Sequence, residues 1–219
     1  VIILCGGVGT RLKEETEFKP KPMVYVGQKP IIWHIMKIYS HFGYNDFILA
    51  LGYKADYIKS YFLNQKALES DFELNTKNHT TKFYLKNRKA VDRFKITFVD
   101  TGLETQPGER ILLCKKYIPK KDKYFMVTYG DGVANVNIKK LLGFHKKQKK
   151  LASITGVHPR SKYVLINVDE RNLVTKFKEK PVLADWVNGG YMIFNRKVMK
   201  YFEPGKMEHE ALKKLASEN

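Results

Sequence analysis

The residues of this sequence best suited to chemistry are a glycine-rich segment, a lysine between two prolines and an aspartate between two glycines. Gly6, Gly7 and Gly9 follow an apolar run at residues 1–4. Without side chains in the way, the backbone N–H groups of such a loop can point at phosphate oxygens. The spacing fits neither a Walker loop nor the dinucleotide fingerprint, since Leu12 stands where the latter needs glycine. The segment therefore predicts another kind of phosphate loop, or a tight turn without a ligand.

Lys21 lies between two prolines, which fix the backbone around it and pre-organise the direction of its ammonium group. Asp131 lies between two glycines after the apolar run 124–129. That run predicts a buried strand, and ligands of open α/β sheets bind beyond the carboxyl ends of strands. A carboxylate beside nucleotide phosphates is a natural Mg²⁺ ligand. A Gly-Asp-Gly turn alone is ordinary, but together with the loop and Lys21 it favours a nucleotide site.

Hydrophobic periodicity predicts the elements that position these residues. We expect strands at 1–4, 46–51, 94–100 and 124–129, and helices at 31–42, 55–63, from 110 onward, at 138–149 and at 208–216. This alternation predicts an α/β, Rossmann-like three-layer fold, with a mostly parallel mixed sheet covered on both faces. The runs 151–157, 164–168, 173–178 and 191–194 either extend that sheet or form a small antiparallel lobe.

Length and composition predict one domain over residues 1–219, with a polar excursion at about 64–93 that favours a hairpin. No apolar run approaches the ~20 residues of a membrane-spanning helix. The sequence shows no secretion signal, and its two cysteines are too few for a disulfide framework, so we expect a cytoplasmic protein. We expect both ends of the chain to be trimmed or disordered.

Basic residues dominate the charge, since 40 Lys and Arg against 22 Asp and Glu leave a net charge of +18. This excess implies an anionic partner: nucleic acid, an anionic membrane surface, or a small polyanion such as a nucleotide. The basic clusters at 115–123 and 145–150 are more typical of solvated faces than of a nucleic-acid patch.

Six motifs of the sequence, in their order along the chain, resemble those of the sugar-1-phosphate nucleotidyltransferases. The resemblance rests on residues 4–12, 19–23, 33–37, 99–102, 129–133 and 177–181, with the family's spacing from Val1 to about Leu215. Within the family, they are most similar to the branch that transfers cytidylyl groups to glucose 1-phosphate. The resemblance implies transfer of CMP from CTP to a phosphate monoester, with Mg²⁺ as cofactor, pyrophosphate as leaving group and a CDP-linked product. It also implies a homo-oligomer and a role in capsule or lipopolysaccharide synthesis.

The resemblance assigns roles residue by residue. The catalytic residues would be Arg11, Lys21 and Asp131, and Asp131 would hold the metal. Nucleotide binding falls to Leu4, Cys5, Gly6, Gly7, Gly9, Thr10, Arg11, Lys21, Thr105, Arg110, Gly130 and Asp131. Acceptor binding falls to Glu179, Lys180, Asn188 and Gly189.

Several positions depart from the family pattern. Cys5 replaces a usual alanine, and Val164 stands where glycine is expected on the acceptor side. The segment 106–110 is less rich in glycine than the pattern. The family's C-terminal segment, with its second metal-binding aspartate, falls beyond Asn219.

Three alternatives stay open. The acceptor is glucose 1-phosphate by default, but a different sugar phosphate or a small non-sugar phosphorylated metabolite fits the same chemistry. A second alternative is a nucleotidyltransferase that uses UTP or dTTP instead of CTP. In an alternative of another class, the chain is a non-catalytic relative that binds RNA or another polyanion through its basic and aromatic residues.

Overall fold

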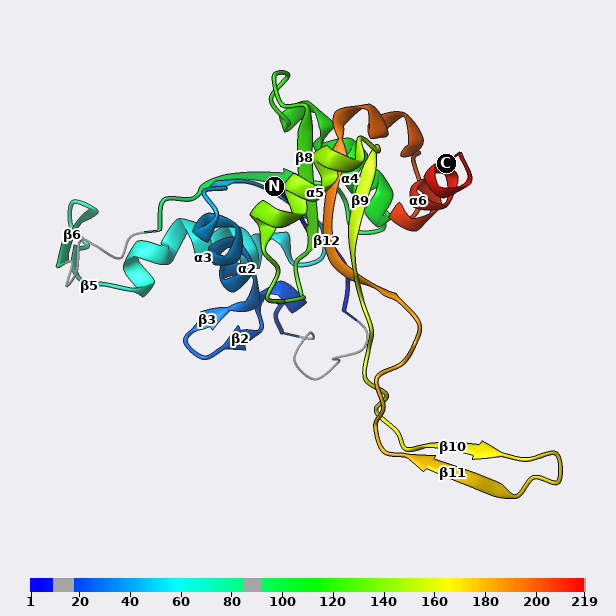
Figure 1. The fold of residues 1–219 in the computed structure, drawn as a ribbon. Helices are drawn as coiled ribbons and strands as arrows, with labels where there is room; N and C mark the ends of the chain where they lie inside the picture. The colour runs from blue at the N-terminus through cyan, green and yellow to red at the C-terminus, as the bar shows by residue number, and fades with distance from the viewer. Residues whose placement is uncertain (10–17, 85–91, 219) are drawn as a thin grey trace.

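A six-stranded sheet forms the centre of the molecule (Figure 1). The computed structural model describes residues 1–9, 18–84 and 92–218. The strand order is β7-β4-β1-β8-β12-β9. These strands are β1 (Ile2–Cys5), β4 (Asp46–Leu51), β7 (Lys95–Asp100), β8 (Tyr124–Tyr129), β9 (Ala152–Val157) and β12 (Val187–Asn195). Only β12 runs against its neighbours in this sheet, which confirms the predicted mostly parallel mixed sheet.

The helices and small hairpins complete the described elements. The α-helices are α2 (Ile31–His41), α3 (Ala55–Leu68), α4 (Pro107–Cys114), α5 (Ile138–Gln148) and α6 (Glu208–Ser217). The 3₁₀ helices are η2 (Lys21–Met23), η4 (Lys115–Tyr117) and η5 (Arg196–Tyr201). Three hairpins stand apart from the central sheet: β2 (Tyr25–Val26) with β3 (Lys29–Pro30), β5 (Asp71–Asn75) with β6 (Thr80–Tyr84), and β10 (Leu165–Val168) with β11 (Val174–Lys178).

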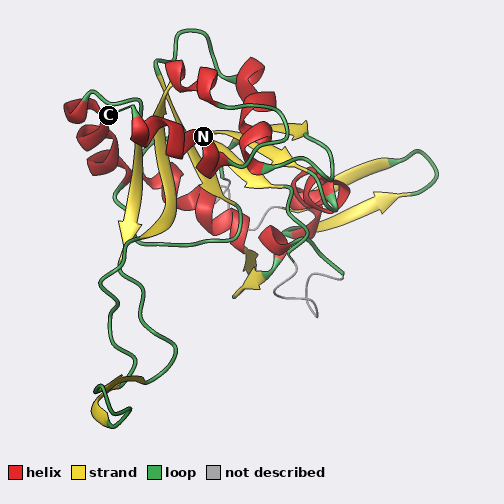
Figure 2. Ribbon diagram, turned by 90° about the vertical axis from the view of Figure 1, so that its right-hand side faces the viewer, coloured by secondary structure: helices red, strands yellow, loops and turns green. Residues whose placement is uncertain are grey.

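Side-chain alternation along the strands divides the core into two layers. On β1, Ile2 and Leu4 pack in one apolar cluster with residues of α4 and α6. Ile3 and Cys5 point to the opposite face and pack with residues of α2, α3 and α5. The sheet is therefore covered by helices on both faces, as the unbroken apolar run of β1 predicts (Figures 1 and 2). This arrangement confirms the three-layer fold class.

The strand order places a topological switch point at β1. From β1 the chain adds β4 and then β7 on one side, and β8 pairs with β1 on the other side. At such a point the connections leave the sheet in opposite directions, and a crevice opens beyond the carboxyl ends of the strands. The segments that follow β1 and β8 are the glycine-rich loop and the Gly-Asp-Gly turn.

The last third of the chain both extends the central sheet and forms a small antiparallel hairpin, the two possibilities that the sequence predicts. β9 and β12 extend the central sheet, whereas β10 and β11 pair only with each other. They lie at the end of a long projection, residues 158–186, which we call the arm (Figures 1 and 2). The polar excursion holds the end of α3 and the β5–β6 hairpin, so the predicted hairpin is confirmed, and residues 85–91 lie outside the described residues.

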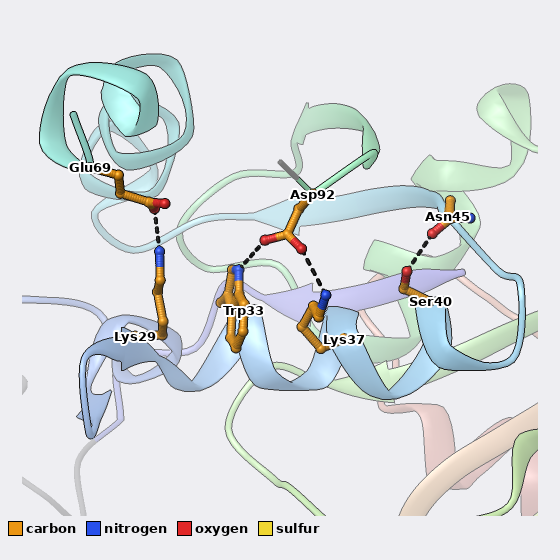
Figure 3. Close-up of polar contacts among 7 residues, drawn as sticks. All are labelled: Lys29, Trp33, Lys37, Ser40, Asn45, Glu69 and Asp92. Atoms are coloured by element: carbon orange, nitrogen blue, oxygen red, sulfur yellow. Dashed lines mark hydrogen bonds and ion pairs between the residues drawn. The ribbon is translucent and has the colours of Figure 1, made fainter. Parts of the chain in front are cut away.

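Polar contacts fix α2 against its surroundings (Figure 3). The Trp33 indole N–H donates to one Asp92 carboxylate oxygen at 2.6 Å, and the Lys37 ammonium binds the other oxygen at 2.8 Å. Ser40 donates to Asn45 at 2.6 Å, which ties the end of α2 to the loop before β4. The helix is thus held in place on the same face of the sheet as η2.

Candidate active site

A cleft of about 580 Å³ opens at the carboxyl ends of β1 and β8. It is lined by Leu4, Cys5, Gly6, Gly7, Val8, Gly9, Lys21, Pro22, Leu103, Glu104, Thr105, Gln106, Pro107, Arg110, Tyr129, Asp131 and Met207. The lining comes from five separate parts of the chain, and a cavity of this size suits a nucleotide-sized ligand. The cleft therefore lies where the topology predicts a binding crevice.

Lys21 is the first residue of η2, and this short helix is rigidly held. The Met23 N–H donates to the Pro20 carbonyl at 2.7 Å, and the Val24 N–H donates to the Lys21 carbonyl at 3.1 Å. Pro22 lies inside the helix, and Met23 is buried against α2. The two prolines and this buried anchor fix the backbone from which the lysine side chain extends, as the sequence predicts.

Lys21 and Asp131 form an ion pair in the cleft. They lie 110 residues apart in the chain, and the parallel pairing of β1 with β8 brings their segments together. Both side chains are partly exposed, so either group is accessible to a ligand. The pair sets a cation and a carboxylate side by side, which suits a site that binds both phosphate oxygens and a metal ion.

Arg110 lies at the floor of the cleft and is 3% exposed. Its guanidinium donates to the carbonyls of Leu51, Gly102, Gly6 and Leu103 at 3.0, 2.8, 3.2 and 3.0 Å, and to the Thr101 hydroxyl at 2.5 Å. These acceptors lie at the end of β4 and directly after β1 and β7. Burial lowers the pKa of Arg110, and among the described residues no carboxylate forms an ion pair with it. The guanidinium thus joins the ends of three strands, and its charge adds positive potential at the cleft floor.

The contact with Gly6 explains why that position is glycine. A Cβ atom on Gly6 would lie 2.1 Å from the Arg110 guanidinium. That side chain is held by all its acceptors, so it cannot easily move aside. The glycine therefore lets the buried arginine reach the carbonyl of the loop, a packing requirement in addition to any contact with phosphate.

The structure brings most of the predicted nucleotide-binding residues together. Nine of them line the cleft: Leu4, Cys5, Gly6, Gly7, Gly9, Lys21, Thr105, Arg110 and Asp131. Gly130 is buried beside them, and its N–H donates to the Leu4 carbonyl at 2.9 Å. Thr10 and Arg11 lie outside the described residues. The ligand contacts assigned to all these residues stay predictions.

The four predicted acceptor residues divide into two groups. Glu179 and Lys180 follow β11 in the arm and do not line the cleft of their own chain (Figure 1). Asn188 and Gly189 lie at the start of β12, and the Asn188 amide donates to the Tyr129 hydroxyl at 3.4 Å. Since Tyr129 lines the cleft, Asn188 lies next to it.

Sequence reasoning missed several cleft residues. Tyr129, directly before the Gly-Asp-Gly turn, is in the matching motif but was given no role. Met207 precedes α6 and lines the cleft although it lies far from Asp131 in the sequence. No sequence pattern marks Met207, because its position depends on how α6 packs across the sheet.

A model of the nucleotidyl transferase family matches residues 1–218. The chain belongs to this family. A probable glucose-1-phosphate cytidylyltransferase of Bacillus subtilis is 38% identical to it over 220 residues, which cover 99% of this chain and 84% of the relative. A glucose-1-phosphate cytidylyltransferase of Salmonella typhi is 39% identical with the same coverage.

A solved structure has the same fold. HddC from Yersinia pseudotuberculosis is 26% identical to this nucleotidyl transferase and superposes with a TM-score of 0.65. The match covers 95% of this chain and 82% of HddC. The chain thus shares its fold with HddC over nearly its whole length.

Both cysteines of this nucleotidyl transferase are buried. Burial raises the pKa of the Cys114 thiol to about 12 and raises that of Cys5 as well. Because the thiolate is the reactive form, we expect neither thiol to react with iodoacetamide at pH 8 in the native protein, and both to react after unfolding. Mass spectrometry of the alkylated protein measures this. Rapid alkylation of Cys5 in the native protein would contradict the buried, uncharged thiol.

Proposed function

We propose that this nucleotidyl transferase catalyses transfer of the cytidylyl group of CTP to glucose 1-phosphate, with CDP-glucose and pyrophosphate as products. The observation that carries the proposal is the identity of 38–39% over 99% of the chain to proteins named for this activity. More distant relatives at 27–30% identity are named mannose-1-phosphate guanyltransferases, and they share a sugar 1-phosphate acceptor but not the base.

The cleft chemistry fits nucleotidyl transfer. A phosphate oxygen of the acceptor attacks the α-phosphorus of CTP, and the bond from that phosphorus to the bridging oxygen of pyrophosphate breaks. The acceptor phosphate is already ionised at neutral pH, so the reaction needs no general base. Its barrier comes from bringing anions together, and catalysis requires positioning and neutralisation of charge. Lys21 supplies a cation in the cleft for this purpose, and Arg11, outside the described residues, is proposed to supply another.

We further propose that Asp131 holds Mg²⁺ in the cleft. Its carboxylate is exposed at the carboxyl end of β8, and a hard oxygen ligand at a phosphate site suits this ion. Among the described residues no three acidic, histidine or cysteine side chains cluster, so phosphate oxygens and water would complete the coordination. The bound ion would neutralise phosphate charge. When it binds, Lys21 would exchange the Asp131 carboxylate for phosphate oxygens.

A substrate panel tests the proposed function. Pyrophosphate release is measured with CTP, UTP, dTTP or GTP, each combined with glucose 1-phosphate, mannose 1-phosphate or a non-sugar phosphate monoester. We expect the highest kcat/KM for CTP with glucose 1-phosphate, and no release without Mg²⁺. A higher kcat/KM with another acceptor would retain the enzyme class and replace the acceptor. Absence of release from every pair would contradict the proposal.

We also propose that the chain forms a homo-oligomer through the arm. Apolar side chains on the arm are largely solvent-exposed, with exposed fractions of 76% for Tyr163, 71% for Phe177 and 70% for Trp186. Such a concentration of exposed apolar surface is typical of protein interfaces. Glu179 and Lys180 lie on this arm, so their predicted acceptor role requires the arm to reach the cleft of a second copy.

Mixing two inactive variants tests a shared site. Lys21→Ala removes the cleft lysine and Lys180→Ala removes the arm lysine, so a hybrid dimer would keep one intact site. Random exchange of subunits is then expected to restore about one quarter of wild-type activity. Glu170→Ala at the tip of the arm is the matched control and is expected to remain active alone. A monomer by light scattering, or no recovery on mixing of inactive variants, would contradict the arrangement.

The setting of the reaction is proposed on chemical grounds. Among the described helices none is long and apolar enough to span a membrane. Free buried thiols and a nucleoside triphosphate substrate are consistent with the cytoplasm. A CDP-sugar is an activated glycosyl donor, so we propose that the product supplies the synthesis of a surface polysaccharide such as a capsule.

A further inference from the structure

A buried carboxylate lies next to the cleft and was not assigned any role. Glu208 is the first residue of α6 and is only 7% exposed. One of its carboxylate oxygens accepts a hydrogen bond from the Tyr129 hydroxyl at 2.5 Å. The other is buried and has no hydrogen-bond partner among the described residues. An acidic residue at a helix N-terminus stabilises the helix through its dipole. An exposed acidic residue would do so without the cost of burying an unpaired oxygen.

Tyr129 links this carboxylate to the predicted acceptor residue Asn188. The Tyr129 hydroxyl oxygen accepts from the Asn188 amide nitrogen at 3.4 Å. The side-chain amide oxygen of Asn188 in turn accepts from the Gly190 N–H at 2.9 Å. Gly190 has a φ of +83°, and a Cβ atom there would lie 3.0 Å from the Tyr129 ring, so glycine permits this close packing.

The hydrogen bonds that run from Asn188 through Tyr129 to Glu208 have a fixed direction. The Tyr129 hydroxyl donates to the Glu208 carboxylate and accepts from the Asn188 amide. A hydroxyl has a single proton, and that of Tyr129 lies in the hydrogen bond to Glu208. The Tyr129 oxygen then presents only lone pairs to Asn188, and the amide must turn its NH₂ group toward the tyrosine. Without Glu208, the hydroxyl could turn its proton toward Asn188, and only the Gly190 N–H would still hold the amide in its orientation.

We propose that Glu208 and Tyr129 are positioning residues that fix the orientation of the Asn188 amide for recognition of the acceptor's sugar hydroxyls. This inference rests on the proposed function and adds two residues to it. In the fixed orientation, Asn188 has one N–H and one carbonyl lone pair left for a ligand. A sugar hydroxyl both donates and accepts, so this pair of groups can recognise the position of a hydroxyl and not only its presence.

Discrimination between epimers tests the proposal. Glucose 1-phosphate is compared with galactose 1-phosphate and mannose 1-phosphate, which differ from it in the configuration of a single hydroxyl. Tyr129→Phe keeps the ring but removes the hydroxyl, and Glu208→Leu removes the acceptor. We expect both variants to raise the KM for glucose 1-phosphate about tenfold and to lower discrimination by a similar factor, while the KM for CTP changes less than about twofold.

Two further variants separate positioning from a structural role. Glu208→Gln retains an oxygen that accepts from the Tyr129 hydroxyl, so it is expected to restore discrimination. Glu210→Gln on the same helix changes a partly exposed carboxylate that accepts from the Met207 N–H, and it is expected to leave discrimination unchanged. A Tyr129→Phe/Glu208→Leu double variant is expected to match the single variants, because both remove the same chain of hydrogen bonds.

The outcomes are distinguishable. Equal losses for CTP and acceptor with a lowered Tm would assign a merely structural role and overturn the proposal, as would unchanged discrimination in Tyr129→Phe. If Glu208→Leu does not fold, Tyr129→Phe and Glu208→Gln still decide. If the wild type transfers nothing, the proposed function fails. The side-chain amide NMR signal of Asn188, assigned with Asn188→Ala, then tests the orientation alone. We expect this signal to shift in Tyr129→Phe and not in Glu208→Gln. An unchanged signal in Tyr129→Phe overturns the proposed hydrogen bonds.

Discussion

Replacing Lys21 with alanine is expected to lower kcat for cytidylyl transfer about 1,000-fold. Lys21 is the cation that the structure places in the cleft beside Asp131, on a backbone held by two prolines. Its loss leaves the carboxylate of Asp131 and the phosphates without that neutralising charge. Stability should change little, because the side chain is partly exposed. Steady-state pyrophosphate release measures kcat, and thermal unfolding measures stability.

Lys19→Ala provides the matched control for this experiment. Lys19 lies two residues earlier in the same segment and does not line the cleft, so its variant should keep nearly full kcat. Lys21→Arg preserves the charge but not the compact ammonium group, and we expect it to recover only a small part of the rate. A Lys21→Ala enzyme within about tenfold of the wild type would show that charge neutralisation by this residue is not central.

Replacing Arg110 with methionine is expected to lower the free energy of unfolding by at least about 3 kcal/mol and to raise the KM for CTP more than about tenfold. The guanidinium joins the end of β4 to the segments after β1 and β7, and its removal leaves carbonyls at the cleft floor unpaired. The loop that carries Gly6 then loses a fixed position against the cleft floor. Urea unfolding and CTP titrations measure the two effects.

Arg196→Met is the matched control for the loss of an arginine that binds carbonyls. Arg196 donates to the carbonyls of Ile118 and Pro119 at 3.1 and 2.7 Å, away from the cleft lining. We expect a loss of about 1–2 kcal/mol and an unchanged KM for CTP. Arg110→Lys should behave like Arg110→Met, since one ammonium cannot reach three segments. An Arg110→Met protein as stable as the wild type, with an unchanged KM for CTP, would contradict the role of this residue.

The local elements could be predicted because their signals are local. The apolar runs of β1, β4 and β8 need no partner to be read as buried strands, and the prolines around Lys21 mark a fixed backbone by themselves. The carboxyl-edge position of Asp131 followed from the alternation of strands and helices. These features together predict a nucleotide site at the carboxyl ends of the strands.

The remaining features depend on contacts between distant parts of the chain. The sequences of β10 and β11 look like strands of a packed sheet, yet every residue of both strands is exposed. Arg110 was predicted to contact nucleotide because of its motif, and only the packing of α4 shows that its guanidinium binds carbonyls. Glu208 lies 79 residues from Tyr129, and neither residue carries a local signal for the other.

Isotope transfer tests the central claim, that this chain moves a cytidylyl group within the cleft, most directly. The protein is incubated with Mg²⁺, glucose 1-phosphate and CTP labelled with ³²P at either the α- or the γ-phosphate, and the products are separated. The account predicts that the α-label appears in CDP-glucose and the γ-label in pyrophosphate, and that Lys21→Ala greatly slows both. Transfer of the γ-label to the sugar, or no transfer of the α-label, would contradict it.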